Sequence, residues 1–188
     1  MATCEAIRSM YIEDNSSSSF TWSSIPNTYE SLRIVGSWCN VNVFENPGQQ
    51  WTNIQLRMGN GSVSTSSIYG HQEMAYTYNS KAIGTEGAQT SFQMRRGMMG
   101  FGGYTAMTSF IVDIYGYKDA DTLTSVNAFY GGCGQESSRD GEDTNVVWTT
   151  GLYNSNAVID TIQFLTGGWG AGNILAGSEV HLYGYKVS

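Results

Sequence analysis

Apolar and polar residues alternate with a period of two along several short stretches, and this alternation limits the folds that the chain can adopt. Leu32, Ile34 and Trp38 fall on one face of an expected strand. The segment from Ile54 to Met58 repeats the pattern and ends at Gly59-Asn60-Gly61, whose residues tolerate the positive φ of a turn. Alternation of this kind predicts half-buried β-strands.

More strands of this kind follow. From Phe110 to Tyr117, the even-numbered residues Phe110, Val112 and Ile114 share one face, and Ile111 and Asp113 share the other. The remaining expected strands cover residues 123–129, 145–152, 158–165 and 179–186, separated by turn-forming clusters of Gly, Asn and Ser. Helical evidence is confined to a short turn that would fit Met1 to Tyr11. Six or more short strands predict an all-β sandwich or barrel.

The chain of 188 residues is long enough to bury a core as one domain. Its net charge is -7, only 13% of residues are charged, and 13% are aromatic, which argues against a disordered acidic protein. The nine Lys and Arg residues are scattered apart from Arg95 and Arg96, so no nucleic-acid partner is expected. Residues 1–15 lack the apolar core of a signal peptide, and no membrane span is expected.

Catalytic chemistry has few candidate residues. His71 and His181 are the two histidines; His181 fits an outward strand position, and we expect His71 at the surface or an interface. No nucleophile elbow, zinc-binding HExxH motif or phosphate loop is present, and no pair of loop carboxylates stands out for a glycosidase. We therefore predict a protein that is not an enzyme, with no catalytic, cofactor or metal residues.

The acidic cluster from Ser138 to Asn145 could be a calcium loop, with Asp140 to Asn145 as its oxygen-rich part, or a solvated turn. Cys4, Cys39 and Cys133 match no metal-binding spacing. We interpret them as free thiols, although a disulfide between two of them stays open. Neither feature assigns a cofactor.

Two glycine-rich segments carry large apolar side chains. Met98, Met99 and Phe101 lie within Gly97 to Gly103, where they could pack on the core or contact a neighbouring subunit. Trp169 is flanked by glycines and could stack on a sugar or a partner, or cover one end of the sandwich. These four residues are our candidates for partner contact.

Five segments of the chain form a recognisable set, namely Phe20 to Leu32, Leu56 to Gly61, Val147 to Thr149, Ala157 to Ala176 and Gly177 to Tyr185. In these segments the chain resembles a family of tailed-bacteriophage virion structural proteins. The resemblance implies an antiparallel jelly-roll β-sandwich of about eight strands, used in head decoration, head fibres or tail fibres. It brings no catalytic residues. Met94 to Gly103 and Gly134 to Asn145 do not match the family pattern.

The expected function is therefore a non-enzymatic virion structural protein, most directly a capsid decoration or head-fibre protein. Its partners would be copies of itself and a major capsid or tail protein. The alternative is a tail-fibre or carbohydrate-binding module that recognises a host surface glycan. We expect one jelly-roll domain over residues 1–188, in which residues 1–18 could form an N-terminal arm. Without a signal peptide, it would be made in the host cytoplasm and end up on the virion.

Overall fold

The computed structural model describes residues 2–14, 17–41, 52–77, 80–98, 105–135, 142–168 and 173–187. Within these ranges the chain forms thirteen β-strands and no helix. The strands are β1 (Ala2–Tyr11), β2 (Ser19–Trp22), β3 (Ser31–Val41), β4 (Thr52–Asn60), β5 (Ser62–Val63), β6 (Tyr69–Thr77), β7 (Ser80–Gln89), β8 (Phe92–Met98), β9 (Thr105–Tyr115), β10 (Thr124–Gln135), β11 (Glu142–Tyr153), β12 (Thr161–Gly168) and β13 (Glu179–Val187). No helix in the described ranges is long and apolar enough to cross a membrane.

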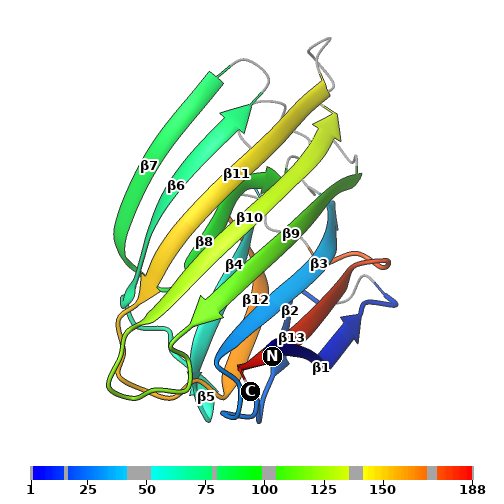
Figure 1. Ribbon diagram of the computed structural model, residues 1–188. Coiled ribbons are helices and arrows are strands. Elements are labelled where there is room, and N and C mark those ends of the chain that lie inside the picture. Colours follow the sequence, from blue (N-terminus) through cyan, green and yellow to red (C-terminus); the bar gives the residue numbers. More distant parts are fainter. Residues whose placement is uncertain are drawn as a thin grey trace.

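The strands form two layers (Figure 1). The large sheet has eight strands in the order β1-β13-β3-β9-β10-β11-β6-β7, and the small sheet has five, in the order β2-β12-β4-β5 with β8 also paired to β4. Every strand pair is antiparallel, so the predicted all-β antiparallel sandwich is confirmed, with more strands than the eight or so expected.

The core lies between the two sheets and is rich in aromatic rings. Phe20 and Phe164 stack at 5.2 Å between ring centroids, and Trp22, Trp38 and Phe110 surround the Phe164 ring. These rings come from β2 and β12 on the small sheet and from β3 and β9 on the large sheet. The alternation in the sequence therefore places one face of each sheet in a common apolar layer.

Buried tyrosine hydroxyls connect the two layers. Tyr69 on β6 donates its hydroxyl proton to the Met58 carbonyl oxygen on β4, at 3.1 Å, and accepts the Met58 amide proton at 2.8 Å. Tyr130 on β10 donates to the Arg95 carbonyl oxygen on β8 at 2.6 Å. Tyr117, just after β9, bonds the Pro26 carbonyl oxygen at 2.6 Å. Each bond joins the large sheet to a strand or loop on the opposite side, so sheet separation and sliding are both constrained.

Several sequence expectations can be compared directly with the strands. The predicted faces of β3, β4, β9 and β13 are confirmed, because Leu32, Ile34, Met58, Val112 and Leu182 are buried. Gly61, with φ of 68°, makes the expected turn after β4.

The helical turn that we expected over Met1 to Tyr11 is wrong. This segment is strand β1, which pairs with β13 along most of its length. It also lies in the part of the chain considered as an N-terminal arm, residues 1–18. The backbone amide and carbonyl groups find partners in β13, and this pairing outweighs the weak local helical pattern.

Both edge strands of the large sheet are irregular. The pairing of β1 with β13 shifts register between Ala6 and Arg8. The pairing of β7 with β6 shifts between Tyr69 and His71, where Ala88 adopts a φ of 56°. Such bulges bend a strand and interrupt its hydrogen-bond ladder.

Removing the Tyr69 hydroxyl should destabilise the fold. In Tyr69→Phe the Met58 amide loses its partner inside the core, so the free energy of unfolding should fall by about 1–3 kcal/mol. Urea denaturation monitored by tryptophan fluorescence measures this change. The control is Tyr76→Phe, because the Tyr76 side chain is exposed on β6; this variant should stay within about 0.5 kcal/mol of the wild type. Equal midpoints for Tyr69→Phe and the wild type would refute the inter-sheet role of this hydroxyl.

Candidate binding surface

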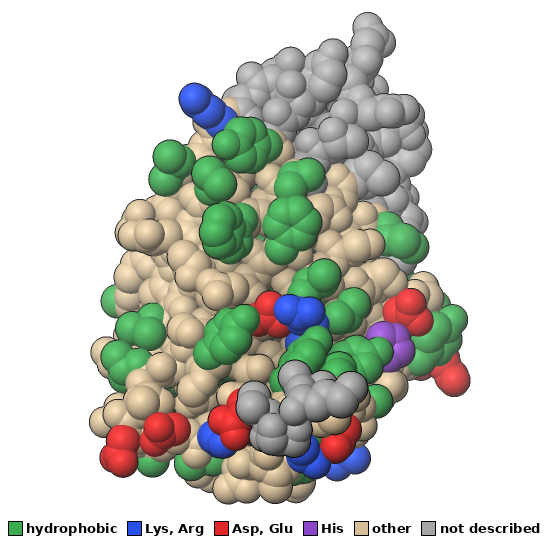
Figure 2. Space-filling view, in the orientation of Figure 1, with side chains coloured by type: hydrophobic (Ala, Val, Ile, Leu, Met, Phe, Trp, Pro, Cys, Tyr) green, Lys and Arg blue, Asp and Glu red, His purple; other side chains and the backbone are tan. Residues whose placement is uncertain are grey.

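The large sheet has one face against the core and one face turned away from the small sheet, here called the outer face. Outward side chains on β9, β10 and β11 are odd-numbered on the first two strands and even-numbered on the third. They include Ile111, Phe129 and Trp148, which are exposed although they are large and apolar. Figure 2 shows hydrophobic side chains gathered on this face of the molecule. Large exposed apolar patches mark interaction sites.

Strand register aligns the exposed side chains into a row across the sheet, here called the apolar row. Phe129 pairs with Ile111 on one side and with Trp148 on the other, and Trp148 pairs with Met74. Continuing outward in both directions, the row consists of Val35, Ile111, Phe129, Trp148, Met74 and Ile83. Phe129 is 57% exposed, Trp148 54% and Ile83 83%. Six neighbouring strands therefore each contribute an apolar side chain to the row, five of them exposed and Val35 half-buried.

One half of the outer face is recessed. An open depression of about 560 Å³, here called the hollow, lies over β13, β3, β9 and β10. Small residues form its floor on the outer face, namely Ser37, Ser109 and Gly131, and Ile111 and Phe129 stand beside them. Residues that pair with one another across the strands are here said to lie on one level. On the level of Ser37, Ser109 and Gly131, the other half of the face carries Val146 and Tyr76, which are 48% and 53% exposed. At this level, therefore, the outer face is low on the half with β3, β9 and β10 and raised on the half with β11 and β6.

A polar row runs beside the apolar row, one level further along the strands. Arg33 and Asp113 form a two-pronged ion pair, with Nε–Oδ1 and Nη2–Oδ2 distances of 2.6 and 2.9 Å. These bonds raise the pKa of Arg33 above its ordinary value, so the pair stays ionised and is neutral as a unit. The row continues through uncharged Asn127, Thr150, Gln72 and Thr85.

A second open depression, of about 450 Å³, lies at the β11, β6 and β7 side of the face. Gln72, Thr85, Ser125 and Thr150 line it together with Leu152. Its outward side chains are hydroxyls, one amide and one apolar group. Glu86, whose carboxylate is bound by Arg95, also lines it. Apart from that ion pair, neutral hydrogen-bonding groups lie beside exposed rings.

His71 is buried, which corrects our expectation of a surface or interface histidine. It lies on the inward face of β6, is 4% exposed, and its ring meets Phe92 edge-on at 5.9 Å. Neither ring nitrogen has a hydrogen-bond partner among the described residues. Burial lowers the pKa of His71, and Arg95 adds to the effect while Glu86 opposes it. The neighbouring alternation Tyr69, His71, Glu73 and Ala75 explains the burial, since all four share the inward face.

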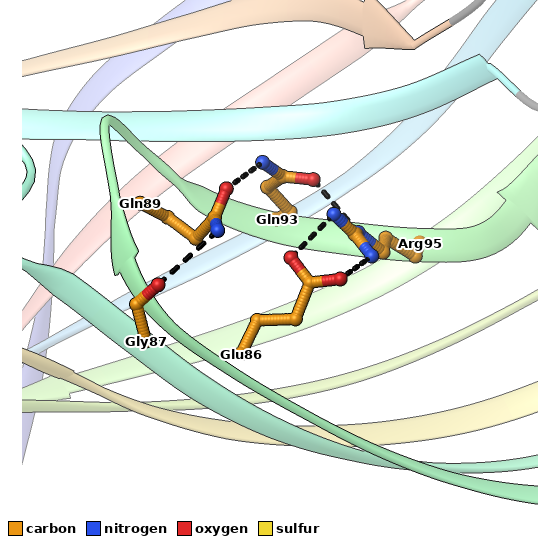
Figure 3. Close-up of polar contacts among 5 residues, drawn as sticks. All are labelled: Glu86, Gly87, Gln89, Gln93 and Arg95. Atoms are coloured by element: carbon orange, nitrogen blue, oxygen red, sulfur yellow. Dashed lines mark hydrogen bonds and ion pairs between the residues drawn. The ribbon is translucent and has the colours of Figure 1, made fainter.

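A polar network between β7 and β8 closes the sandwich near His71 (Figure 3). The Arg95 guanidinium binds both Glu86 carboxylate oxygens, and its Nε donates to Gln93 Oε1 at 2.7 Å. Gln93 Nε2 donates to Gln89 Oε1 at 3.2 Å, and Gln89 Nε2 to the Gly87 carbonyl at 3.2 Å. Because these groups bind one another, we interpret the network as a link between the sheets.

The four residues proposed for partner contact fall largely outside the described part of the chain. Met98 is the last residue of β8 and pairs with Thr52 through the backbone, but its side chain is not described. Met99, Phe101 and Trp169 lie outside the described residues. The apolar row was missed in the sequence, although the outward positions of Ile111 in 110–117 and of Trp148 in 145–152 were its signal.

The acidic cluster from Ser138 to Asn145 is split by the structure. Residues 142–145 begin β11 and pair with β10, so this half is strand and not loop; residues 136–141 lie outside the described part. Antiparallel pairing with residues 132–135 accounts for the difference. Across the described residues, no three or more His, Cys, Asp or Glu side chains gather as metal ligands.

Two other expectations can be compared with the described side chains. Cys4 is a free, exposed thiol, whereas the Cys39 and Cys133 side chains are not described. His181 faces outward as predicted, with Nδ1 3.0 Å from the Ser9 hydroxyl oxygen. Cys4 therefore fits the free-thiol interpretation, and the state of the other two cysteines stays a prediction.

No family model and no curated protein matches this chain. Among solved structures, it is similar to peanut lectin with a 9mer peptide, at 8% identity and a TM-score of 0.33 over 100% of both chains. It is also similar to basic winged bean lectin with Tn-antigen, at 10% identity and 0.28 over 88% of this chain and 77% of the other. The lectin I from Ulex europaeus with the methyl glycoside of α-L-fucose gives 9% and 0.16 over 89% and 97%. At such scores, the fold description rests on the strands and their pairing alone.

The buried, unpaired His71 should make stability depend on pH. Its folded pKa lies below the ordinary 6.5, so the unfolded chain binds the proton first as pH falls. Stability from this residue is therefore complete above about pH 6.5 and is lost below it, down to the folded pKa.

Urea midpoints at neutral and mildly acidic pH, compared for the wild type and His71→Leu, measure this contribution. The variant should lose less stability on acidification than the wild type. His181→Gln, which alters the outward-facing histidine, should keep the loss of the wild type. An equal acid loss in the wild type and His71→Leu would refute the role of His71.

Proposed function

We propose that this protein is a non-enzymatic binding module and that it binds through the outer face of the large sheet. The observation that carries the proposal is the apolar row, in which Ile111, Phe129, Trp148 and Ile83 are all exposed although they are large. Isolated apolar residues on a surface need no explanation, but a band in register over six strands is costly to leave in water. A partner that covers the band would remove this cost.

Its proposed setting is the surface of a phage virion, with copies of the same chain and a capsid or tail protein as partners. The resemblance of Phe20 to Leu32 and Gly177 to Tyr185 to virion structural proteins supports this setting. A charge-poor outer face supports it as well, since the interior of protein interfaces is depleted of charge. The proposal includes virion location after synthesis in the host cytoplasm.

A second candidate function, carbohydrate binding, is favoured by one specific observation. Phe129 and Trp148 lie directly beside Asn127, Thr150 and Gln72, with the 450 Å³ depression next to them. Sugars offer apolar ring faces that stack on aromatic side chains and hydroxyls that bond amides and alcohols. A neutral host surface glycan is the ligand that this pair of rows would suit.

Virion incorporation tests the first proposal. A phage that encodes the chain, complemented with Phe129→Ser plus Trp148→Ser, should yield particles depleted of the protein, because each change removes a large exposed ring from the binding face. Quantitative immunoblotting of purified particles measures incorporation. Gln163→Ala, a change on the outward side of β12 in the small sheet, should leave incorporation unchanged. Wild-type levels of the double variant, or particles that never contain the wild-type chain, would contradict the proposal.

Glycan arrays followed by calorimetry test the second candidate. If a neutral glycan binds the outer face, Trp148→Ala should weaken it about tenfold through lost stacking, and Asn127→Ala several-fold through lost hydrogen bonds. Gln163→Ala again serves as the control with unchanged affinity. This candidate would be ruled out if no glycan on the array bound the protein, or if a bound glycan had the same affinity for Trp148→Ala and Asn127→Ala as for the wild type.

A further inference from the structure

We infer that the outer face binds a second copy of this chain, face to face, about a two-fold axis that runs parallel to β10. The inference rests on the proposed function and specifies its partner. Without the edge strand β1, the outer face of the eight-stranded sheet has seven strands in the order β13-β3-β9-β10-β11-β6-β7, with β10 in the middle. The two-fold axis lays β11 over β9 of the other copy, β6 over β3, and β7 over β13. Because the axis is parallel to the strands, residues on a given level of one copy face residues on the same level of the other copy.

This arrangement matches the relief of the face. The raised half carries Trp148, Tyr76 and Val146, and the hollow on the other half has Ser37, Ser109 and Gly131 at its floor. Under the two-fold axis Val146 lies opposite Ser109, and Tyr76 lies opposite Ser37, because each pair occupies the same level. Bulky side chains of each copy thus meet the recess of the other.

The apolar row also meets itself, except at its β7 end, where Ile83 lies opposite His181 of the other copy. Trp148 lies opposite Ile111, Met74 opposite Val35, and Phe129 opposite its own copy. Each exposed ring would thereby exchange water for apolar contact. Two twisted sheets commonly pack with their strands nearly aligned and about 10 Å apart, which is the geometry that this axis produces.

Charges on the face agree with the same axis. Among described outward side chains on these seven strands, the charged ones are Lys81, Glu179, Arg33 and Asp113. Arg33 and Asp113 neutralise each other within one chain. Lys81 lies on β7 and Glu179 on β13, at opposite ends of one level that runs through Tyr76, Val146, Gly131, Ser109 and Ser37. The axis brings Lys81 of each copy opposite Glu179 of the other.

The face is large enough for a stable dimer. Seven strands span about 30 Å at the usual strand spacing, and four levels of outward residues span about 20 Å along the strands. The contact would cover roughly 600 Å² per copy, or about 1,200 Å² in total, which exceeds the ~1,000 Å² expected of a specific interface. The chain's net charge of -7 then lies largely outside the contact, where solvent screens it.

Sedimentation equilibrium of the full chain and its variants tests the inference. The wild type should dimerise, and Trp148→Ser should weaken the dimer about 100-fold, as loss of a central aromatic contact does. Lys81→Glu and Glu179→Lys should each weaken it about tenfold, because each sets like charges opposite one another twice. The double exchange K81E/E179K should restore an affinity close to the wild type. Asp121→Lys, the same charge change as Glu179→Lys in the exposed turn after β9, is the control and should leave the dimer intact.

The outcomes separate this inference from the proposed function. Dimers that require Trp148 but do not weaken with either charge variant would overturn the two-fold arrangement and leave the outer face as a binding surface. A wild-type chain that stays monomeric, yet binds particles or a glycan through Trp148, would overturn the dimer and leave the proposed function standing. A monomeric chain whose binding to particles and glycans is unchanged by every outer-face substitution would overturn both the dimer and the proposed function. Circular dichroism of each variant confirms that a lost dimer is not a lost fold.

Discussion

Contact between the two aromatic layers is the interaction on which the rest of the molecule depends. Trp38 and Phe110 from the large sheet reach Phe20 and Phe164 from the small sheet, and dispersion and burial stabilise the layer without fixing its alignment. The buried hydroxyls of Tyr69 and Tyr130 add direction, since a hydrogen bond to one chosen carbonyl is lost when the sheets slide. Apolar packing therefore supplies the affinity between the sheets, and the tyrosines supply the alignment.

Because that contact uses only the inner side of the large sheet, its other side is available for binding. The strands that hold Phe129 and Trp148 are fixed from behind by Tyr130 and Val147 in the core. A rigid, broad sheet can present several side chains in one plane, at low entropic cost to a partner. The polar network of Arg95, Glu86 and Gln93 serves the same end, because it keeps β7 and β8 joined where the sandwich closes.

Much of the fold could be predicted from the alternation, whereas the proposed binding surface could not. The pattern from Phe110 to Tyr117 correctly assigned Ile111 to one face and Val112 to the other, because a period of two is a local property. Which outward residues lie side by side depends on register, and the pairing of Phe129 with both Ile111 and Trp148 is set by strands distant in sequence. His71 was misjudged for a related reason. Polar residues lie on both faces of β6, so the sequence alone does not show that His71 points inward, where Phe92 of β8 packs against its ring.

The bulges in the two edge strands decide how molecules of this kind can associate. An uninterrupted edge invites another chain to extend the sheet, and extension of that kind has no natural end. Here the ladder is broken near Ala6 on β1 and near Ala88 on β7, so both borders resist such extension. Continuation of the large sheet is therefore disfavoured, and the face-to-face contact that we infer would instead close at two copies.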